Sequence, residues 1–127
     1  MKAVTFFGKL EVKDVPAPVR SDEVRVQVVQ AGICNTDLEI VRGYMDFQGI
    51  LGHEFVGRVS EGSKKLAPGQ RVVADINCAC GQCDFCLRGL RRHCPSRTTL
   101  GIFRRDGAMA KFVWLPEDQL YAVPDTV

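Results

Sequence analysis

The sequence lacks several features that would place it in other classes of protein. No apolar run approaches the roughly eighteen residues that a membrane-spanning helix needs, and no signal-peptide pattern is found. Neither sign of charge dominates, because 17 Lys and Arg are balanced by 15 Asp and Glu, so we expect neither nucleic acid nor a membrane as partner. A Gly-x-Gly-x-x-Gly fingerprint and a Walker loop are both missing, which argues against a phosphate cradle within these residues.

Histidine is also scarce, with two residues, whereas cysteine is abundant, with six. Four of the cysteines follow the pattern C-x2-C-x2-C-x7-C: Cys80, Cys83, Cys86 and Cys94. Thiolates at this spacing can converge on one zinc ion, and four sulfurs leave no position open for a substrate. The pattern predicts a structural zinc loop at 78–95. Metal-type spacing argues against disulfides and favours a reducing compartment, which we expect to be the cytosol.

Short segments of alternating or β-branched residues, separated by Gly and Pro, predict a mostly β chain with a few short helices. Strands are expected at 2–7, 10–15, 23–30, 50–59, 71–76, 110–115 and 120–123, and glycines at 52 and 57 are expected to interrupt the one at 50–59. One short helix is expected from an N-cap at Asn35 to about Arg42, and Pro116 is expected to open a single helical turn. Pro68-Gly69 predicts a type II turn. Since no repeat or linker interrupts the pattern, we expect one domain, 1–127, with a barrel or sandwich architecture.

A second set of chemistry-bearing residues precedes the zinc loop. Thr36 and Asp37 follow Cys34 closely, and His53-Glu54 begins nineteen residues after Cys34. Cysteine, histidine and a carboxylate are ligand types of catalytic zinc sites that keep one position open. Thr36 has a hydroxyl that can pass on a substrate proton, and Asp37 is placed to orient His53 through its second ring nitrogen. A small core cysteine and an ordinary His–Glu pair would explain the same residues without a metal.

Together these motifs resemble the N-terminal domain of the zinc-dependent medium-chain alcohol dehydrogenases. The matching stretches are Gly32-Ile33-Cys34-Asn35-Thr36-Asp37, Gly52-His53-Glu54 with Gly57 and Val59, Pro68-Gly69-Gln70-Arg71-Val72, and the four spaced cysteines. They occur in the family's order and cover nearly the whole chain. The resemblance implies a GroES-like, partly open β-barrel.

For the site, the resemblance implies a catalytic zinc held by Cys34, His53 and Glu54, with Thr36 starting a proton relay, and a structural zinc held by the four spaced cysteines. Zinc acts as a Lewis acid in this family while hydride moves between a small alcohol or carbonyl substrate and NAD or NADP. The family's Rossmann domain and one further zinc ligand have no counterpart here. We therefore expect a catalytic-domain fragment, inactive alone, of an enzyme that is a homo-oligomer at full length.

Two alternatives remain open. An iron–sulfur protein also uses C-x2-C-x2-C before a Cys-Pro pair, although its last gap is three residues rather than seven. A zinc-stapled GroES-like binding module without catalysis would use the arginines near the loop, and it leaves Cys34 and His53 unexplained. These arginines are Arg88, Arg91, Arg92, Arg104 and Arg105. Cys78 is expected to be a buried residue at a strand end and His93 an exposed one.

Overall fold

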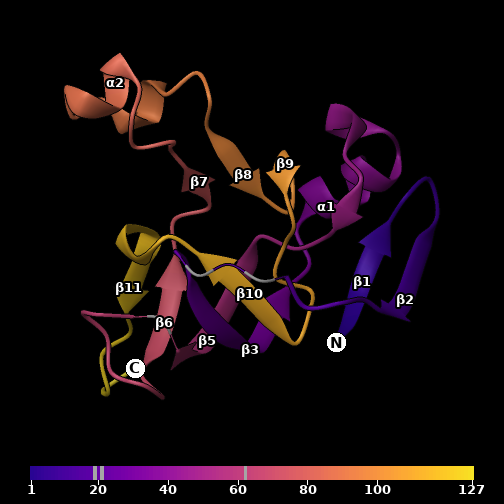
Figure 1. Ribbon diagram of the computed structural model, residues 1–127. Helices are drawn as coiled ribbons and strands as arrows, with labels where there is room; N and C mark the ends of the chain where they lie inside the picture. Colours follow the sequence, from indigo (N-terminus) through magenta and orange to yellow (C-terminus); the bar gives the residue numbers. More distant parts are fainter. Residues whose placement is uncertain (19, 21, 62) are drawn as a thin grey trace.

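Three β-sheets, one of five strands and two of three, make up most of the computed structural model, which describes residues 1–18, 20, 22–61 and 63–127 (Figure 1). The strands are β1 Lys2–Phe6, β2 Leu10–Asp14, β3 Val24–Gly32, β4 Gly49–Ile50, β5 Glu54–Glu61, β6 Arg71–Ala74, β7 Asn77–Cys78, β8 Thr98–Leu100, β9 Arg104–Arg105, β10 Phe112–Leu115 and β11 Leu120–Ala122. The helical elements are α1 Asn35–Val41, α2 Asp84–Leu87 and the 3-10 turns η1 Tyr44–Asp46, η2 Arg91–His93 and η3 Glu117–Gln119. Within the described residues, no helix is long and apolar enough to cross a bilayer.

The five-stranded sheet has the order β10-β3-β5-β6-β11 and contributes most of the main core. Along β3, Val24 and Val26 are buried in this core, whereas Gln27, the next residue, is exposed. The alternation expected from the sequence is therefore confirmed. The core consists of Val24, Val26, Val59, Val72, Cys78, Leu100, Ala108, Val113, Leu115 and Leu120. Among the described strands the ladder ends at β10 and β11 without closing. The mostly β, partly open architecture is therefore confirmed.

A smaller core lies where the sheet β2-β1-β4 meets α1. It is made of Phe6, Ile40, Phe47 and Leu51. Ile40 on α1 is fully buried here, and Leu51 follows directly after β4. The burial of these four side chains therefore fixes α1 beside the connection between β4 and β5.

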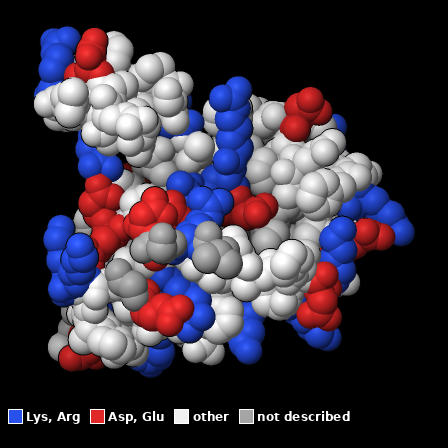
Figure 2. Space-filling view, viewed as in Figure 1, with Lys and Arg blue, Asp and Glu red and all other residues white. Residues whose placement is uncertain are grey.

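The third sheet, β7-β8-β9, leads to a lobe that projects from the sheets and holds α2 and η2 (Figure 1). Strands this short are too brief for an alternation of apolar and polar residues to be detected, and they were not predicted. Acidic and basic side chains intermingle over the face shown in Figure 2, and no single-sign field covers it. This distribution agrees with the nearly balanced composition.

The turn and helix predictions hold with one correction. Gln70 N–H donates to Ala67 C=O at 3.1 Å, and Gly69 has a φ of +82°, as a type II turn requires. The turn after Pro116 forms as η3. The helix N-cap is Cys34 rather than Asn35, because the Asp37 carboxylate reaches back to the Cys34 N–H.

The segment 50–59, expected as a strand interrupted by glycines at 52 and 57, is interrupted at Gly52 but not at Gly57. The structure divides it into β4 and β5, with Leu51–His53 in neither strand. Gly52 has a φ of +97°, a backbone conformation that glycine adopts without strain and that ends a regular strand. The break matters because it carries His53.

Candidate metal centres

Four cysteine sulfurs of the projecting lobe meet at one point. The Sγ atoms of Cys80, Cys83, Cys86 and Cys94 all lie within 4.8 Å of one another, and each of these cysteines is free of disulfides. The Cys83–Cys94 Sγ distance is 3.8 Å and the Cys80–Cys86 distance is 4.0 Å. Thiolates at the usual Zn–S distance of about 2.3 Å stand about 3.8 Å apart at the corners of a tetrahedron. The separations therefore fit a closed four-sulfur site.

Local backbone structure prepares this cluster. Cys83 caps α2, Cys86 lies within α2, and the N–H of Cys80 donates to Cys94 Sγ at 3.4 Å. Hydrogen bonds from the backbone N–H groups of Gln82 and Cys83 lower the pKa of Cys80 to about 6. The thiolate that a metal requires is thus favoured at one corner by main-chain donors.

A second cluster forms on the sheet side of α1. One ligand atom each from Cys34, His53 and Glu54 lies within 4.8 Å of the other two. The pairing of β3 with β5 brings them together, since Gly32 is opposite Glu54 in the register and Cys34 follows two residues later. Glu54 Oε2 lies 2.9 Å from the position that a Cβ on Gly32 would occupy. The absence of a side chain at Gly32 therefore leaves room for the Glu54 carboxylate.

Asp37 ties the two halves of this second cluster together. Its carboxylate accepts hydrogen bonds from the N–H of Cys34 at 2.9 Å and from the N–H of Gly52 at 3.2 Å. His53 Nδ1 lies 3.5 Å from Asp37 Oδ1, and this buried nitrogen has no closer partner within the described residues. Both side chains are more than nine-tenths buried. The arrangement fits a histidine whose ring is held by a carboxylate on one side and a ligand on the other.

The break that carries His53 is held firmly although it lies outside the strands. Leu51 N–H donates to Val4 C=O, while Leu51 and Gly52 C=O accept from Met109 and Ala108 N–H at 2.8 Å each. A Cβ on Gly52 would stand 2.8 Å from Met109 N. These contacts fix the backbone of the segment, and the position of the His53 Cα is therefore well defined.

Sequence reasoning missed one residue that supports this break. Asp106 Oδ1 accepts a hydrogen bond from the N–H of Ile50 at 2.9 Å. The only signal in the sequence was the pair Asp106-Gly107, which indicates a turn and nothing about a partner 56 positions away. Long-range contacts of this kind become visible only in the fold.

Thr36 lies beside the second cluster, whereas Cys78 and His93 belong to neither cluster. Thr36 Oγ1 is 3.6 Å from Cys34 Sγ. Cys78 is buried in the main core at the end of β7, and His93 is exposed, as expected. Burial raises the pKa of Cys78 to about 11, so this cysteine is a neutral thiol at neutral pH.

The arginines near the loop do not form one basic patch. Arg91 pairs with Asp118. Arg105 is largely buried in an ion pair with Glu23, where Nη1 lies 2.9 Å from Oε1. Arg88, Arg92 and Arg104 are exposed, as in a solvated loop surface, whereas Arg105 is largely buried. A common nucleic-acid contact through all five is not what this arrangement favours.

Residues 20–125 match the family described as "Alcohol dehydrogenase GroES-like domain". The chain belongs to this family. Within it, an "Uncharacterized zinc-type alcohol dehydrogenase-like protein" from Haemophilus influenzae is 39% identical over 124 residues, which are 91% of this chain and 36% of that protein.

Solved structures of longer dehydrogenases share this GroES-like fold. An alcohol dehydrogenase from Thermus sp. ATN1 is 34% identical with a TM-score of 0.83, over 98% of this chain and 40% of that one. The rspB protein of Escherichia coli CFT073, described as an alcohol dehydrogenase complexed with NADH, is 30% identical with a TM-score of 0.83, over 100% and 39%. The chain thus spans about two-fifths of the length of the proteins that it matches.

Proposed function

We propose that this chain is the catalytic-domain portion of a zinc-dependent alcohol dehydrogenase, with residues 1–127 forming one GroES-like domain. The main support is the convergence of Cys34, His53 and Glu54, whose ligand atoms lie within 4.8 Å of one another. These residues come from the N-cap of α1, the break between β4 and β5, and the start of β5. A thiol, an imidazole and a carboxylate that converge beside a buried Asp–His pair are readily explained by a metal site. The zinc-type description of a relative favours zinc over an iron–sulfur cluster.

Each residue of the second cluster has a role in this proposal. Cys34, His53 and Glu54 hold the metal. Asp37 holds the His53 ring through Nδ1, which leaves Nε2 as the ligand atom. Thr36 is near enough to Cys34 to accept a hydrogen bond from a substrate hydroxyl and to pass its own proton towards solvent.

The proposed reaction is the interconversion of a small alcohol and its carbonyl. When bound, zinc supplies a Lewis acid that favours loss of the hydroxyl proton. On oxidation the hydroxyl proton would leave through Thr36, and NAD or NADP, when bound, would accept the hydride from the substrate carbon, so that substrate is oxidised and cofactor reduced. In the other direction Thr36 returns the proton. The chain's contribution is to place the substrate oxygen beside Thr36 and to orient the imidazole of His53 through Asp37.

The four-cysteine lobe has a structural role in the same proposal. Cys80, Cys83, Cys86 and Cys94 would hold a second zinc ion with four thiolates, which would leave no position for a substrate. The exposed apolar side chains of Val12, Val29 and Ile33 suit a surface that packs against further chain in a full-length, oligomeric enzyme. The fragment is expected to bind the structural zinc tightly, the catalytic zinc weakly, and to lack turnover alone.

Metal counting with matched variants tests the proposal. Wild-type chain, His53→Ala and Cys83→Ala are loaded with Co²⁺ in place of zinc and titrated with a chelator. We expect one tight and one weak ion in the wild type, loss of the weak ion in His53→Ala, and loss of the tight ion in Cys83→Ala. In the full-length enzyme, His53→Ala should lose dehydrogenase activity while keeping its fold. A full-length His53→Ala enzyme with unchanged turnover would rule out the catalytic assignment.

A further inference from the structure

A cavity of about 320 Å³ lies apart from both cysteine-based clusters. Its walls come from several separate stretches of the chain: β1, the proline-rich segment 15–18, β4, the stretch 105–107 and β10. Thr5, Pro16, Ile50, Val113 and Trp114 are among the residues that line it, and the candidate metal ligands are not. A cavity of this size, with mainly apolar walls, is large enough for a small organic molecule.

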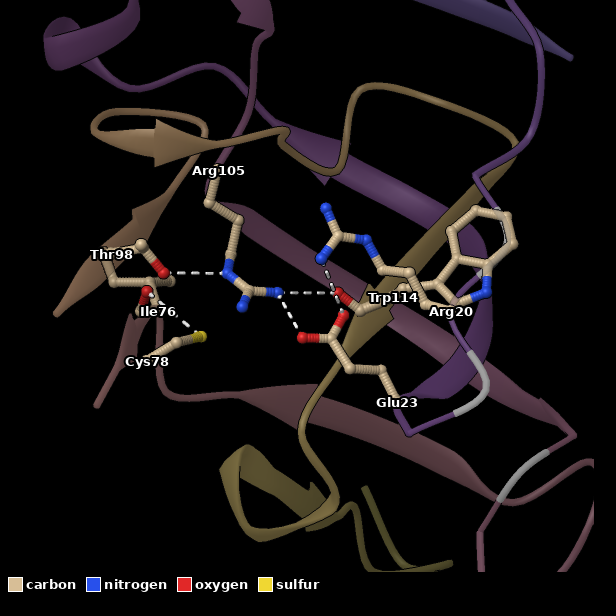
Figure 3. Close-up of polar contacts among 7 residues, drawn as sticks. All are labelled: Arg20, Glu23, Ile76, Cys78, Thr98, Arg105 and Trp114. Atoms are coloured by element: carbon tan, nitrogen blue, oxygen red, sulfur yellow. Dashed lines mark hydrogen bonds and ion pairs between the residues drawn. The ribbon is translucent and has the colours of Figure 1, made fainter. Parts of the chain in front are cut away.

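Two arginines, Arg20 and Arg105, also line the cavity. Figure 3 shows both directed toward the carboxylate of Glu23. Arg105 is fixed, since Nη1 donates to Glu23 Oε1 at 2.9 Å and Nε donates to Thr98 Oγ1 at 2.9 Å. Its side chain is 13% exposed, so this pair is largely shielded from solvent.

The Arg20 side chain makes fewer close polar contacts than that of Arg105 and is more exposed. Its Nη1 lies 3.8 Å from Glu23 Oε2, within ion-pair range but too far for a hydrogen bond. Its side chain is 43% exposed, whereas that of Glu23 is 7% exposed. The two guanidiniums share one carboxylate, and Arg20 therefore has donors to offer a further acceptor.

Two other charged groups of the lining make contacts within the chain, and Asp106, which is exposed, keeps one carboxylate oxygen free of its contact with Ile50. Asp106 Oδ1 accepts the N–H of Ile50 at 2.9 Å. The amino group of Met1 donates to Val15 C=O at 2.7 Å and lies 4.0 Å from Asp14. Arg20 is thus the charged group best placed to meet a ligand.

We propose that this cavity binds a small apolar molecule that carries one carboxylate. The apolar part lies against Ile50, Val113 and Trp114, and the carboxylate accepts a forked pair of hydrogen bonds from Arg20. A planar guanidinium matches a carboxylate in this way better than it matches a hydroxyl, and an ammonium is repelled. The site is independent of the proposed dehydrogenase chemistry, because none of the metal ligands contributes to it.

Trp114 is the chain's single tryptophan and lines the cavity, so its fluorescence reports occupancy. The chain is titrated with octanoate, octanol and octylamine, which share one apolar tail and differ in the head group. We expect saturable binding of octanoate at least about tenfold tighter than that of octanol, and the weakest binding for octylamine. Equal affinity for octanoate and octanol, or no saturable response to octanoate, would overturn the proposal.

A matched pair of variants locates the head group. Arg20→Gln should reduce octanoate affinity to that of octanol and leave octanol binding unchanged, because only the carboxylate contact is lost. Arg42→Gln, at an exposed arginine outside the cavity lining, and His53→Ala should both bind octanoate like the wild type. Unchanged octanoate affinity in Arg20→Gln would overturn the proposal. So would octanoate-induced amide shifts centred on Val29 and Ile33 instead of Ile50 and Val113.

Discussion

Gly32 lies opposite Glu54 in the β3–β5 ladder, and its missing side chain leaves the space that the Glu54 carboxylate occupies. A Cβ there would approach Oε2 to 2.9 Å, closer than such atoms normally come. The atom displaced is the far end of a flexible side chain, so the backbone need not move. The pair thus links a glycine that has no chemistry of its own to the geometry of the candidate catalytic site.

Gly32→Ala should therefore weaken metal binding at the second cluster without unfolding the protein. We expect about a tenfold loss of Co²⁺ affinity at this cluster, because a ligand carboxylate is pushed from its place. The four-cysteine site serves as the internal control and should be unchanged. In a Glu54→Ala background, Gly32→Ala should cause no further loss of Co²⁺ affinity. A further loss there would show that Gly32 does not act through the Glu54 carboxylate.

Asp37→Asn tests the carboxylate that joins Cys34, Gly52 and His53. The amide presents one oxygen and one NH₂ group where two oxygens accept backbone N–H groups, so a buried donor is left facing a donor. We expect a loss of about 1–3 kcal/mol in the free energy of unfolding, measured with urea, and weaker metal binding at the second cluster. Asp14→Asn, on an exposed side chain, is the control and should leave both unchanged.

Removal of zinc from the lobe should destabilise the chain because four thiolates lose their shared partner. Chelation at neutral pH is expected to release the tight ion and to lower the unfolding temperature measured by circular dichroism. Cys83→Ala should have no such ion to release. Cys78→Ala is the matched control, since this buried thiol packs in the main core outside the cluster, and it should keep the ion.

Glu117 should make stability depend on acid pH. Its Oε1 accepts hydrogen bonds from Ser63 Oγ and from the N–H groups of Lys64 and Lys65, and the Ser63 bond is the largest cause of a pKa lowered below the ordinary value of 4.5. A carboxyl with a lowered folded pKa stabilises the fold above its unfolded pKa, and this contribution is lost as pH falls through the lowered value. As pH is lowered from 6 to 3, the free energy of unfolding should therefore fall less steeply for Glu117→Gln than for the wild type. Parallel pH dependences of the two proteins would contradict this role.

The sequence was most informative where chemistry is local. Cys80 to Cys94 and the Pro68-Gly69 turn could be predicted because residue spacing alone defines their geometry. The strands that alternate clearly, such as β3, were predicted for the same reason. The short strands β7 to β9 could not be found, because two or three residues carry no period.

The support around His53 was harder to predict. That Asp37 would lie near His53 was expected from the residue types, yet its hydrogen bonds to the N–H groups of Cys34 and Gly52 depend on how α1 packs beside the β4–β5 break. Asp106 depends on a contact across 56 positions. The break itself follows from the φ of Gly52, a conformation that a strand-like sequence pattern does not reveal.

The two clusters differ in how far apart their members lie along the chain, and this sets the order in which they can assemble. The four sulfurs of the lobe fall within fifteen consecutive positions, 80–94, so a metal ion can gather them while the rest of the polypeptide is still unstructured, at a small cost in loop closure. Cys34 and Glu54 meet only after β3 has paired with β5. A newly made chain would accordingly capture its first ion early, and its second site would exist only as a late product of folding.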